Sequence, residues 1–295
     1  MIAVLAVGLI TSLPSQAAGR KKNPTSKLYV ADVNGTADID TGETIDELTK
    51  RSVYTAEGTV IETKADSNNA MVFSNGTGIY LDPETRLEVR KFVQEPFTPN
   101  RSDMEVEPSI STTNTFLPRG AVSLCTSKLV AGSTMNYATP HANISVKGSK
   151  VVIDSNAKGT TVSLLGGEVT VQAGEFDSGG KVLEQGQQAF IPADGGPVQI
   201  QPIPQDQAAA LDDKVTMACM ARKTVYFDVS DKKVGDGQDG AGSDEITAFD
   251  TSDESDEGTG GSGSNKSGEI VVKRAATGET PIQFTVSAAT IPTKK

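Results

Sequence analysis

The sequence predicts an all-β protein of many short antiparallel strands, forming a sandwich, a barrel or a β-roll, with one short helix after the main domain. Short apolar runs recur from residue 52 to residue 192, separated by glycine and proline turn signals. The 295-residue chain has no Trp and only 5% aromatic residues, so Val, Ile, Leu and Ala must form its core. Its 29 Gly and 14 Pro are typical of a chain that reverses often.

The first 18 residues have the pattern of a secretory signal peptide. An apolar run from Ile2 leads to Pro14 and then to small residues around Ala17, like the h-region and cleavage site of exported proteins. This run is shorter than the roughly 20 apolar residues of a membrane-spanning helix. We therefore expect a signal peptide at 1–18, no transmembrane anchor, and a mature protein in the periplasm, at the cell surface or outside the cell.

Residues 19–51 are predicted to be a polar N-terminal segment with one strand at 28–33 and a helical turn at 45–50. The main β domain is predicted over residues 52–229, because the strand pattern becomes regular at Ser52.

Turn signals divide the first half of this domain. Asn75-Gly76 lies between two apolar runs and predicts a hairpin with a two-residue turn. Asp82-Pro83 is expected to end the second strand of that hairpin.

Glycines also interrupt the apolar runs of the second half. Gly148 separates the runs 144–146 and 151–153, and Gly166-Gly167 separates 161–165 and 168–171. We interpret each glycine position as the turn of a hairpin.

Three further segments follow the predicted strands. An Ala-rich stretch near 204–221 has apolar residues at helical spacing and predicts one amphipathic helix. Residues 230–268 are acidic and rich in Gly and Ser, which predicts a disordered linker. Residues 269–295 contain two short apolar runs and predict a terminal β-hairpin, which would be only marginally stable alone.

The charge distribution excludes one class of partner. The net charge is −11, and residues 228–257 hold eleven acidic side chains against two lysines. The rest of the chain is close to neutral and has no basic stripe, so a nucleic-acid partner is not expected.

No motif in the sequence predicts an enzyme. His141 is the only histidine, and no nucleophile motif accompanies it. We expect His141 to be a surface residue at the start of a strand, and we predict no catalytic residue, no cofactor and no metal site. The Asp and Gly residues between Asp236 and Glu245 lack the ligand spacing of a calcium loop.

Cys125 and Cys219 are the only cysteines. An exported protein can form a disulfide, so these two are a candidate pair. Two separate, buried cysteines acting as small apolar residues are an equal alternative.

Several segments resemble the FecR family in their order along the chain. The segment 139–153 is similar to its Thr-Pro entry, strand, Gly-Ser turn and second strand, and 160–171 is similar to its next hairpin. Lys181 to Ala189 resembles its closing Leu-x-x-Gly-Gln element, and 70–89 resembles an upstream hairpin. The resemblance extends over roughly residues 52–192 and implies an all-β domain outside the cytoplasmic membrane.

In the best-known members of that family, the domain senses an outer-membrane transporter, and a transmembrane helix and a cytoplasmic segment carry the signal to a sigma factor. We expect this chain to lack both the helix and the cytoplasmic anti-sigma segment. The leading hypothesis is therefore a non-enzymatic binding or scaffold module of the cell envelope, whose partner is an envelope or surface protein or a polysaccharide. The alternative is a periplasmic sensor component of a FecR-type system linked to a transporter and a sigma factor.

Overall fold

The computed structural model describes residues 26–95, 97, 105–174, 177, 179–231, 248–249 and 268–274. The predicted signal peptide at 1–18 lies outside these residues. So do most of the predicted linker at 230–268 and the part of the predicted terminal hairpin beyond residue 274.

Fifteen strands form one large sheet, and a single helix follows them in the described part of the chain. The strands are β1 (Lys27–Asn34), β2 (Ala37–Asp40), β3 (Ile45–Glu47), β4 (Val53–Thr55), β5 (Val60–Thr63), β6 (Asn68–Phe73), β7 (Gly78–Leu81), β8 (Arg86–Gln94), β9 (Ser111–Cys125), β10 (Thr134–Ala138), β11 (Ala142–Asn156), β12 (Gly159–Ala173), β13 (Lys181–Leu183), β14 (Gln187–Pro192) and β15 (Gln199–Pro202). All their pairings are antiparallel except that of β9 with β10. The all-β prediction is confirmed.

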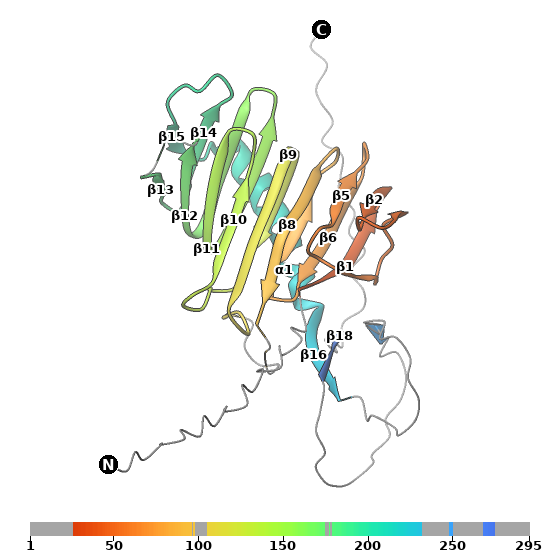
Figure 1. The fold of residues 1–295 in the computed structure, drawn as a ribbon. Coiled ribbons are helices and arrows are strands. Elements are labelled where there is room, and N and C mark those ends of the chain that lie inside the picture. Colours follow the sequence, from red (N-terminus) through yellow and green to blue (C-terminus); the bar gives the residue numbers. More distant parts are fainter. Residues whose placement is uncertain are drawn as a thin grey trace, which may run out of the picture.

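The sheet folds into two layers because three long strands run through both of them (Figure 1). Residues 111–119 of β9 pair with β8, whereas residues 120–125 pair with β7 and β11. The strands β11 and β12 divide in the same way. The first layer therefore has the order β13-β12-β11-β10-β9-β8-β5-β2-β3, and the second has the order β15-β14-β12-β11-β9-β7-β6-β1-β4.

Glycines with positive φ bend the long strands between the layers. They are Gly120 in β9 (φ 88°), Gly148 in β11 (φ 61°) and Gly167 in β12 (φ 91°). This arrangement corrects the prediction that Gly148 and Gly166-Gly167 are hairpin turns. The glycines permit a local change of direction that other residues rarely adopt, but each strand continues in the next layer rather than reversing.

Side chains from both layers form one apolar core between them. Phe73 of β6 contacts Phe92 of β8, with ring centroids 4.9 Å apart. These two residues belong to opposite layers, and both are fully buried. Aliphatic residues fill the rest of the core, as the aromatic-poor composition predicts.

The N-terminal segment differs from its prediction. Residues predicted as a separate polar segment at 19–51 contribute β1, β2 and β3 to the large sheet, so the folded domain begins before residue 52. The predicted helical turn at 45–50 is instead β3 and the chain that follows it. This stretch contains two apolar residues, Ile45 and Leu48. Leu48 is buried but Ile45 is 72% exposed, so the stretch has no continuous apolar helix face.

The predicted hairpin at Asn75-Gly76 is present between β6 and β7. Its turn is longer than the predicted two residues, because the amide of Phe73 donates to the carbonyl of Thr77 and the amide of Gly76 donates to the carbonyl of Phe73. Gly76 alone of these residues has a positive φ, 83°, as in a turn closed by a glycine bulge.

The helix α1 (Gln205–Lys223) agrees with the predicted helix near 204–221. Its buried residues are Val215, Ala218 and Ala221, so the packed stripe lies in the second half of the helix. Arg222 and Lys223 stand in the last turn, where cations interact favourably with the helix dipole. No helix in the described residues is long and apolar enough to cross a membrane.

A small second sheet contains β16 (Val225–Asp231), β17 (Ala248–Phe249) and β18 (Gly268–Arg274). The strand β18 includes the first strand of the predicted terminal hairpin, and in the structure it pairs with β16. The predicted second strand at 282–286 lies outside the described residues.

Candidate binding surface

The helix α1 covers the outer face of the second layer (Figure 1). Ala218 and Ala221 pack there against a set of side chains from β1, β6 and β7. That set consists of Tyr29, Ala70, Val72 and Tyr80. Because this apolar patch is closed by the helix, the covered side of the second layer is not available to a ligand.

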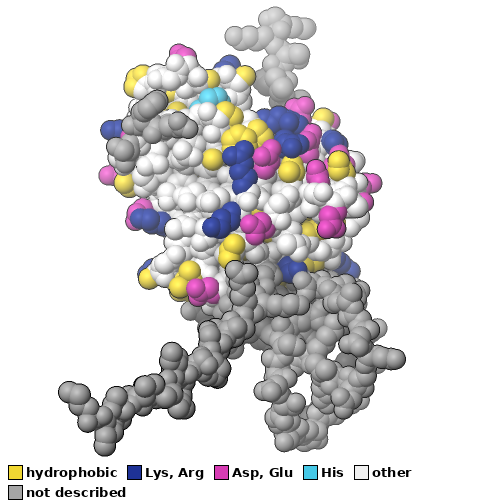
Figure 2. Space-filling model, viewed as in Figure 1, with side chains coloured by type: hydrophobic (Ala, Val, Ile, Leu, Met, Phe, Trp, Pro, Cys, Tyr) yellow, Lys and Arg dark blue, Asp and Glu magenta, His cyan; other side chains and the backbone are white. Residues whose placement is uncertain are grey.

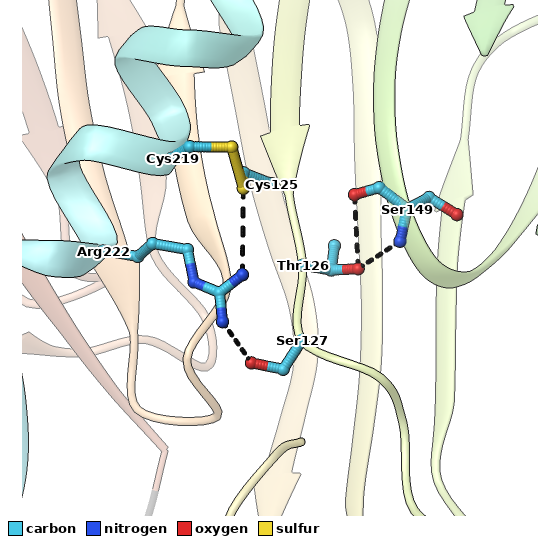
Figure 3. Close-up of a disulfide and its surroundings, with 6 residues drawn as sticks. All are labelled: Cys125, Thr126, Ser127, Ser149, Cys219 and Arg222. Carbon is cyan, nitrogen blue, oxygen red and sulfur yellow. Dashed lines mark hydrogen bonds between the residues drawn. A yellow bond between two sulfur atoms is a disulfide. The ribbon is translucent and has the colours of Figure 1, made fainter. Parts of the chain in front are cut away.

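A disulfide between Cys125 and Cys219 joins the helix to β9 (Figure 3). The Cα atoms are 5.0 Å apart and the residues are 94 positions apart in the sequence. Of the two alternatives that the sequence left open, the structure has the paired cysteines. Arg222 lies beside the bond, with Nη1 donating to Cys125 Sγ at 3.7 Å and Nη2 donating to Ser127 Oγ at 2.7 Å.

Two further contacts hold the helix against the sheet. A Cβ atom added to Gly78 of β7 would lie 2.0 Å from the carbonyl oxygen of Ala218, so only glycine permits this approach. Lys214 Nζ forms a salt bridge with Asp82 at the end of β7. Burial raises the pKa of the Asp82 carboxyl above its usual value, although Lys214 acts in the opposite direction.

The outer face of the first layer carries many short, uncharged polar side chains with charged ones between them, and no described helix packs on it (Figure 2). The pattern of buried and exposed residues places every second side chain of β9, β10, β11 and β12 on this face. Eight of them are short amide or hydroxyl side chains: Thr112, Asn114, Thr134, Asn136, Asn143, Ser145, Thr170 and Gln172. Phe116, Ala138 and the exposed ion pair of Lys147 with Glu168 lie on the same face. We call the eight amide and hydroxyl residues the polar face.

The polar face is ordered in rows across the strands. Asn114 lies opposite Asn136, Asn136 lies opposite Ser145, and Ser145 lies opposite Thr170. Asn136 Nδ2 donates to Asn114 Oδ1 at 3.3 Å. Such a row presents amide and hydroxyl groups at the spacing of the strands, about 4.8 Å.

A charged group flanks the polar face on the side of β5 and β8. Arg86 bonds to Glu62 at 3.1 Å and to Glu88 at 3.2 Å, and Arg119 bonds to Glu62 at 2.7 Å. Burial raises the pKa of Glu62, but the hydrogen bonds from the two arginines outweigh it and leave the pKa below its usual value. Since the cations are matched by carboxylates, this group has little net charge.

An aromatic side chain stands between the charged group and the polar face. The guanidinium of Arg90 lies over the ring of Phe116, 3.8 Å from its centroid. Phe116 is opposite Ala138 of β10, and both are only partly buried. Phe116 and Ala138 are neighbouring apolar residues in a row whose other side chains are polar. The stacked guanidinium of Arg90 holds the ring of Phe116 in its orientation.

His141 lies in the turn between β10 and β11, as the sequence predicts for a residue at a strand start. Its Nδ1 is 3.1 Å from Thr160 Oγ1, which is itself 2.8 Å from Thr139 Oγ1. The amides of His141 and Ala142 donate to Thr139 Oγ1. These bonds close the turn. His141 does not lie beside Cys125, because Cys125 is opposite Lys150 in the pairing of β9 with β11.

Glu107 is a buried carboxylate at the opposite end of the sandwich, and it is only 3% exposed. Ser111 Oγ donates to one of its oxygens at 2.8 Å, and the amide of Val130 donates to the other at 2.9 Å. Burial raises its pKa above the usual value. These bonds tie the chain before β9 to the loop before β10. The described residues contain no group of three His, Cys, Asp or Glu side chains that could hold a metal ion.

Sequence reasoning did not identify the polar face as a unit. The threonines in 111–117 are a local signal for a strand, but Pro108 precedes them closely and is typical of a loop. Only the pairing of β9 with β10, of β10 with β11 and of β11 with β12 brings the four strands together, and no local pattern reveals it.

The fold defines a two-layer β domain with a disulfide-linked helix on one face and an open polar surface on the other. Residues 59–170 match the sequence model of the FecR protein family. The chain therefore contains a FecR domain, and the resemblance stated from the sequence is confirmed for these residues. The match begins at the turn before β5 and ends within β12, so it includes every residue of the polar face except Gln172.

Two crystal structures of a candidate anti-sigma factor from Parabacteroides distasonis ATCC 8503 are similar to this chain. Each is 14% identical with a TM-score of 0.38, and each alignment covers 51% of this chain. The alignments cover 62% and 63% of those proteins, so this chain spans about three fifths of their length. No curated protein matches the chain.

Proposed function

We propose that this chain is a non-enzymatic binding component of a FecR-type signalling system outside the cytoplasm. The observation that carries the proposal is the FecR match over 59–170, which coincides with the central strands of both layers. The partner in this proposal is an outer-membrane transporter or a membrane-bound regulator of a sigma factor. The polar face is the surface through which we expect the contact, because α1 covers the central strands β6, β7 and β9 on the other outer face.

A scaffold module of the envelope is the second candidate. The abundance of uncharged polar groups favours it, since the eight amide and hydroxyl side chains of the polar face can exchange hydrogen bonds with the hydroxyl groups of a polysaccharide. Phe116 at the border would offer a ring edge to a sugar, as aromatic residues do in many small-ligand sites.

The test is recovery of partners from an envelope extract of the source organism, with the tagged full chain as bait. Asn136→Arg places a long cation in the middle of the polar face, and Gln207→Arg makes the same change of one charge at an exposed position of α1 as a matched control. We expect a transporter or sigma regulator to be recovered by the parent chain and by the control, with recovery at least tenfold lower for Asn136→Arg.

Other outcomes separate the candidates. Recovery of glycan, sensitive to Asn136→Arg, supports the scaffold. Equal recovery by Asn136→Arg and Gln207→Arg contradicts the use of the polar face. Substrate turnover by the purified chain that disappears in His141→Ala would overturn the non-enzymatic part of the proposal.

A further inference from the structure

We propose that the Cys125–Cys219 disulfide is a thiol–disulfide exchange site, in which a dithiol attacks Cys219 and Cys125 is the leaving group. The proposal goes beyond the binding function and stands on the surroundings of the bond rather than on the FecR match. Three features carry it: the unequal exposure of the two cysteines, the position of Arg222, and the patch that the helix covers.

The two cysteine residues differ in exposure. Cys125 is 4% exposed and lies in β9 under the helix, whereas Cys219 is only partly buried on α1. A thiolate must reach the sulfur that it attacks. Attack from solvent therefore favours Cys219, and the electrons of the broken bond pass to Cys125.

Arg222 is placed to stabilise that leaving group. It lies one helical turn after Cys219, and its Nη1 contacts Sγ of Cys125, the more buried of the two cysteines (Figure 3). The bond from Nη2 to Ser127 Oγ fixes the guanidinium in this position. A guanidinium keeps its charge at all physiological pH values, and a cation beside a cysteine favours the thiolate. A more stable leaving thiolate leaves faster.

The exchange balances with a dithiol as the two-electron reductant. Its first thiolate forms a bond to Cys219 Sγ as the Cys125–Cys219 bond breaks, which gives a mixed disulfide at Cys219 and a thiolate at Cys125. Its second thiolate then attacks the reductant sulfur of that mixed disulfide and releases Cys219 as a thiolate, which takes up a proton. The dithiol becomes a disulfide, and the protein gains two electrons.

Reduction would loosen one element and leave the sandwich intact. The disulfide joins α1 to β9 and lies outside the core between the layers. Without it, the helix is held by the Lys214–Asp82 bridge and by the packing of Ala218 and Ala221. Release of the helix would uncover the apolar patch that includes Val72 and Tyr80, so the oxidation state would control access to that patch.

The first experiment identifies the attacked sulfur in the parent chain. The oxidised full-length protein is treated briefly with reduced glutathione, a monothiol that forms a mixed disulfide with the attacked sulfur. Acid quenching at early times protonates Cys125 before it can expel the glutathione, and the adduct is mapped by mass spectrometry. We expect the adduct on Cys219. An adduct mainly on Cys125 overturns the assignment of the leaving group, and an absence of any adduct or free thiol under native conditions overturns the exchange site itself.

The second experiment tests Arg222. Reduction by dithiothreitol at pH 7 is followed by alkylation and mass analysis for the parent chain, Arg222→Gln, Arg222→Lys and the neighbouring control Lys223→Gln. We expect Arg222→Gln to be reduced about three- to tenfold more slowly, Arg222→Lys to recover most of the rate because it keeps the cation, and Lys223→Gln to match the parent. Faster or equal reduction of Arg222→Gln refutes the role of the guanidinium, since a variant that merely loosened the helix would expose the bond and react faster.

Hydrogen exchange measures the consequence for the helix. On reduction of the parent chain, amides of residues 208–223 should exchange at least tenfold faster, while amides of β11 and β12 keep their protection. Unchanged exchange in α1 would show that the bond does not control the helix.

Discussion

The close contact between the bends of β11 and β12 leads to a sharp prediction about Gly167. Its φ is 91°, and a Cβ atom added there would lie 2.1 Å from the carbonyl oxygen of Gly148 and 2.7 Å from the Cα of Ser149. Both atoms belong to the neighbouring strand, so the backbone itself would have to move. Gly167→Ala therefore combines an unfavourable dihedral angle with a steric clash.

The two contributions can be separated with matched variants. A left-handed conformation destabilises a folded protein with alanine at that position by about 1–2 kcal/mol. Replacing glycine with alanine also lowers the entropy of the unfolded chain, which stabilises the folded state by about 0.4–1 kcal/mol. Gly186→Ala should show only this balance, close to 1 kcal/mol, because Gly186 has a φ of 83° and no atom within 4 Å of the added Cβ. Gly167→Ala should also bear an overpacking cost of about 1–3 kcal/mol, for a total near 3 kcal/mol.

The assay is equilibrium unfolding in urea, with the free energy of unfolding compared between the parent and each variant. Gly166→Ala is the second control, because Gly166 has an ordinary φ and its nearest contacts are 4.0 Å from the added Cβ; its effect should lie within 0.5 kcal/mol of zero or be slightly stabilising. If Gly167→Ala is no more destabilising than Gly186→Ala, the contact between the bends does not constrain the fold, and the reasoning is refuted.

Three further perturbations follow from the core and from the buried charges. Phe92→Ala should lower the free energy of unfolding by about 3–5 kcal/mol in urea titrations, because a fully buried ring is lost from the contact with Phe73. Burial raises the folded-state pKa of Glu107 above the unfolded value of 4.5. Its contribution to stability is therefore greatest below pH 4.5 and declines as the pH rises through the folded pKa. In thermal unfolding from pH 4 to pH 8, the melting temperature of Glu107→Gln should depend less on pH than that of the parent. Lys214→Met should raise the pKa of Asp82 further in a carboxyl NMR titration and destabilise the protein by about 1–2 kcal/mol, less than a fully buried pair because Lys214 remains 36% exposed.

The class of fold follows from the sequence because its signals are local. Alternating apolar residues, Asn75-Gly76 and Asp82-Pro83 act over a few positions, and the structure has strands and turns where they predict them. The helix also follows from its own composition. The boundaries of the glycine-interrupted strands do not follow, because a glycine between two apolar runs has the same local signature in a hairpin turn and in a bend.

What distinguishes a bend from a turn is pairing with strands that are distant in the sequence. Gly148 is a bend because the residues after it pair with β9, while those before it pair with β10. The polar face depends on the same non-local pairing. The cysteine pair depends on non-local packing as well. Cys125 and Cys219 are 94 residues apart in the sequence, and only the packing of α1 on β9 brings them together.

The N-terminal strands show a different limit. The strand β2 has only four residues and alternates buried Ala37 and Ile39 with acidic side chains. Such a short polar pattern is indistinguishable from a solvated loop until β5 lies beside it. The FecR match likewise begins at residue 59 and omits these strands.

The passage of β9, β11 and β12 through both layers has a consequence for the kinetics of folding. Neither layer can be completed while the other is absent, because each needs the same three strands. The chain must also bring β1 to β6 and β9 to β11 before the core closes, and closing such long loops slows folding. We therefore expect the sandwich to refold slowly and as one cooperative unit, with fluorescence and circular dichroism reporting the same single rate.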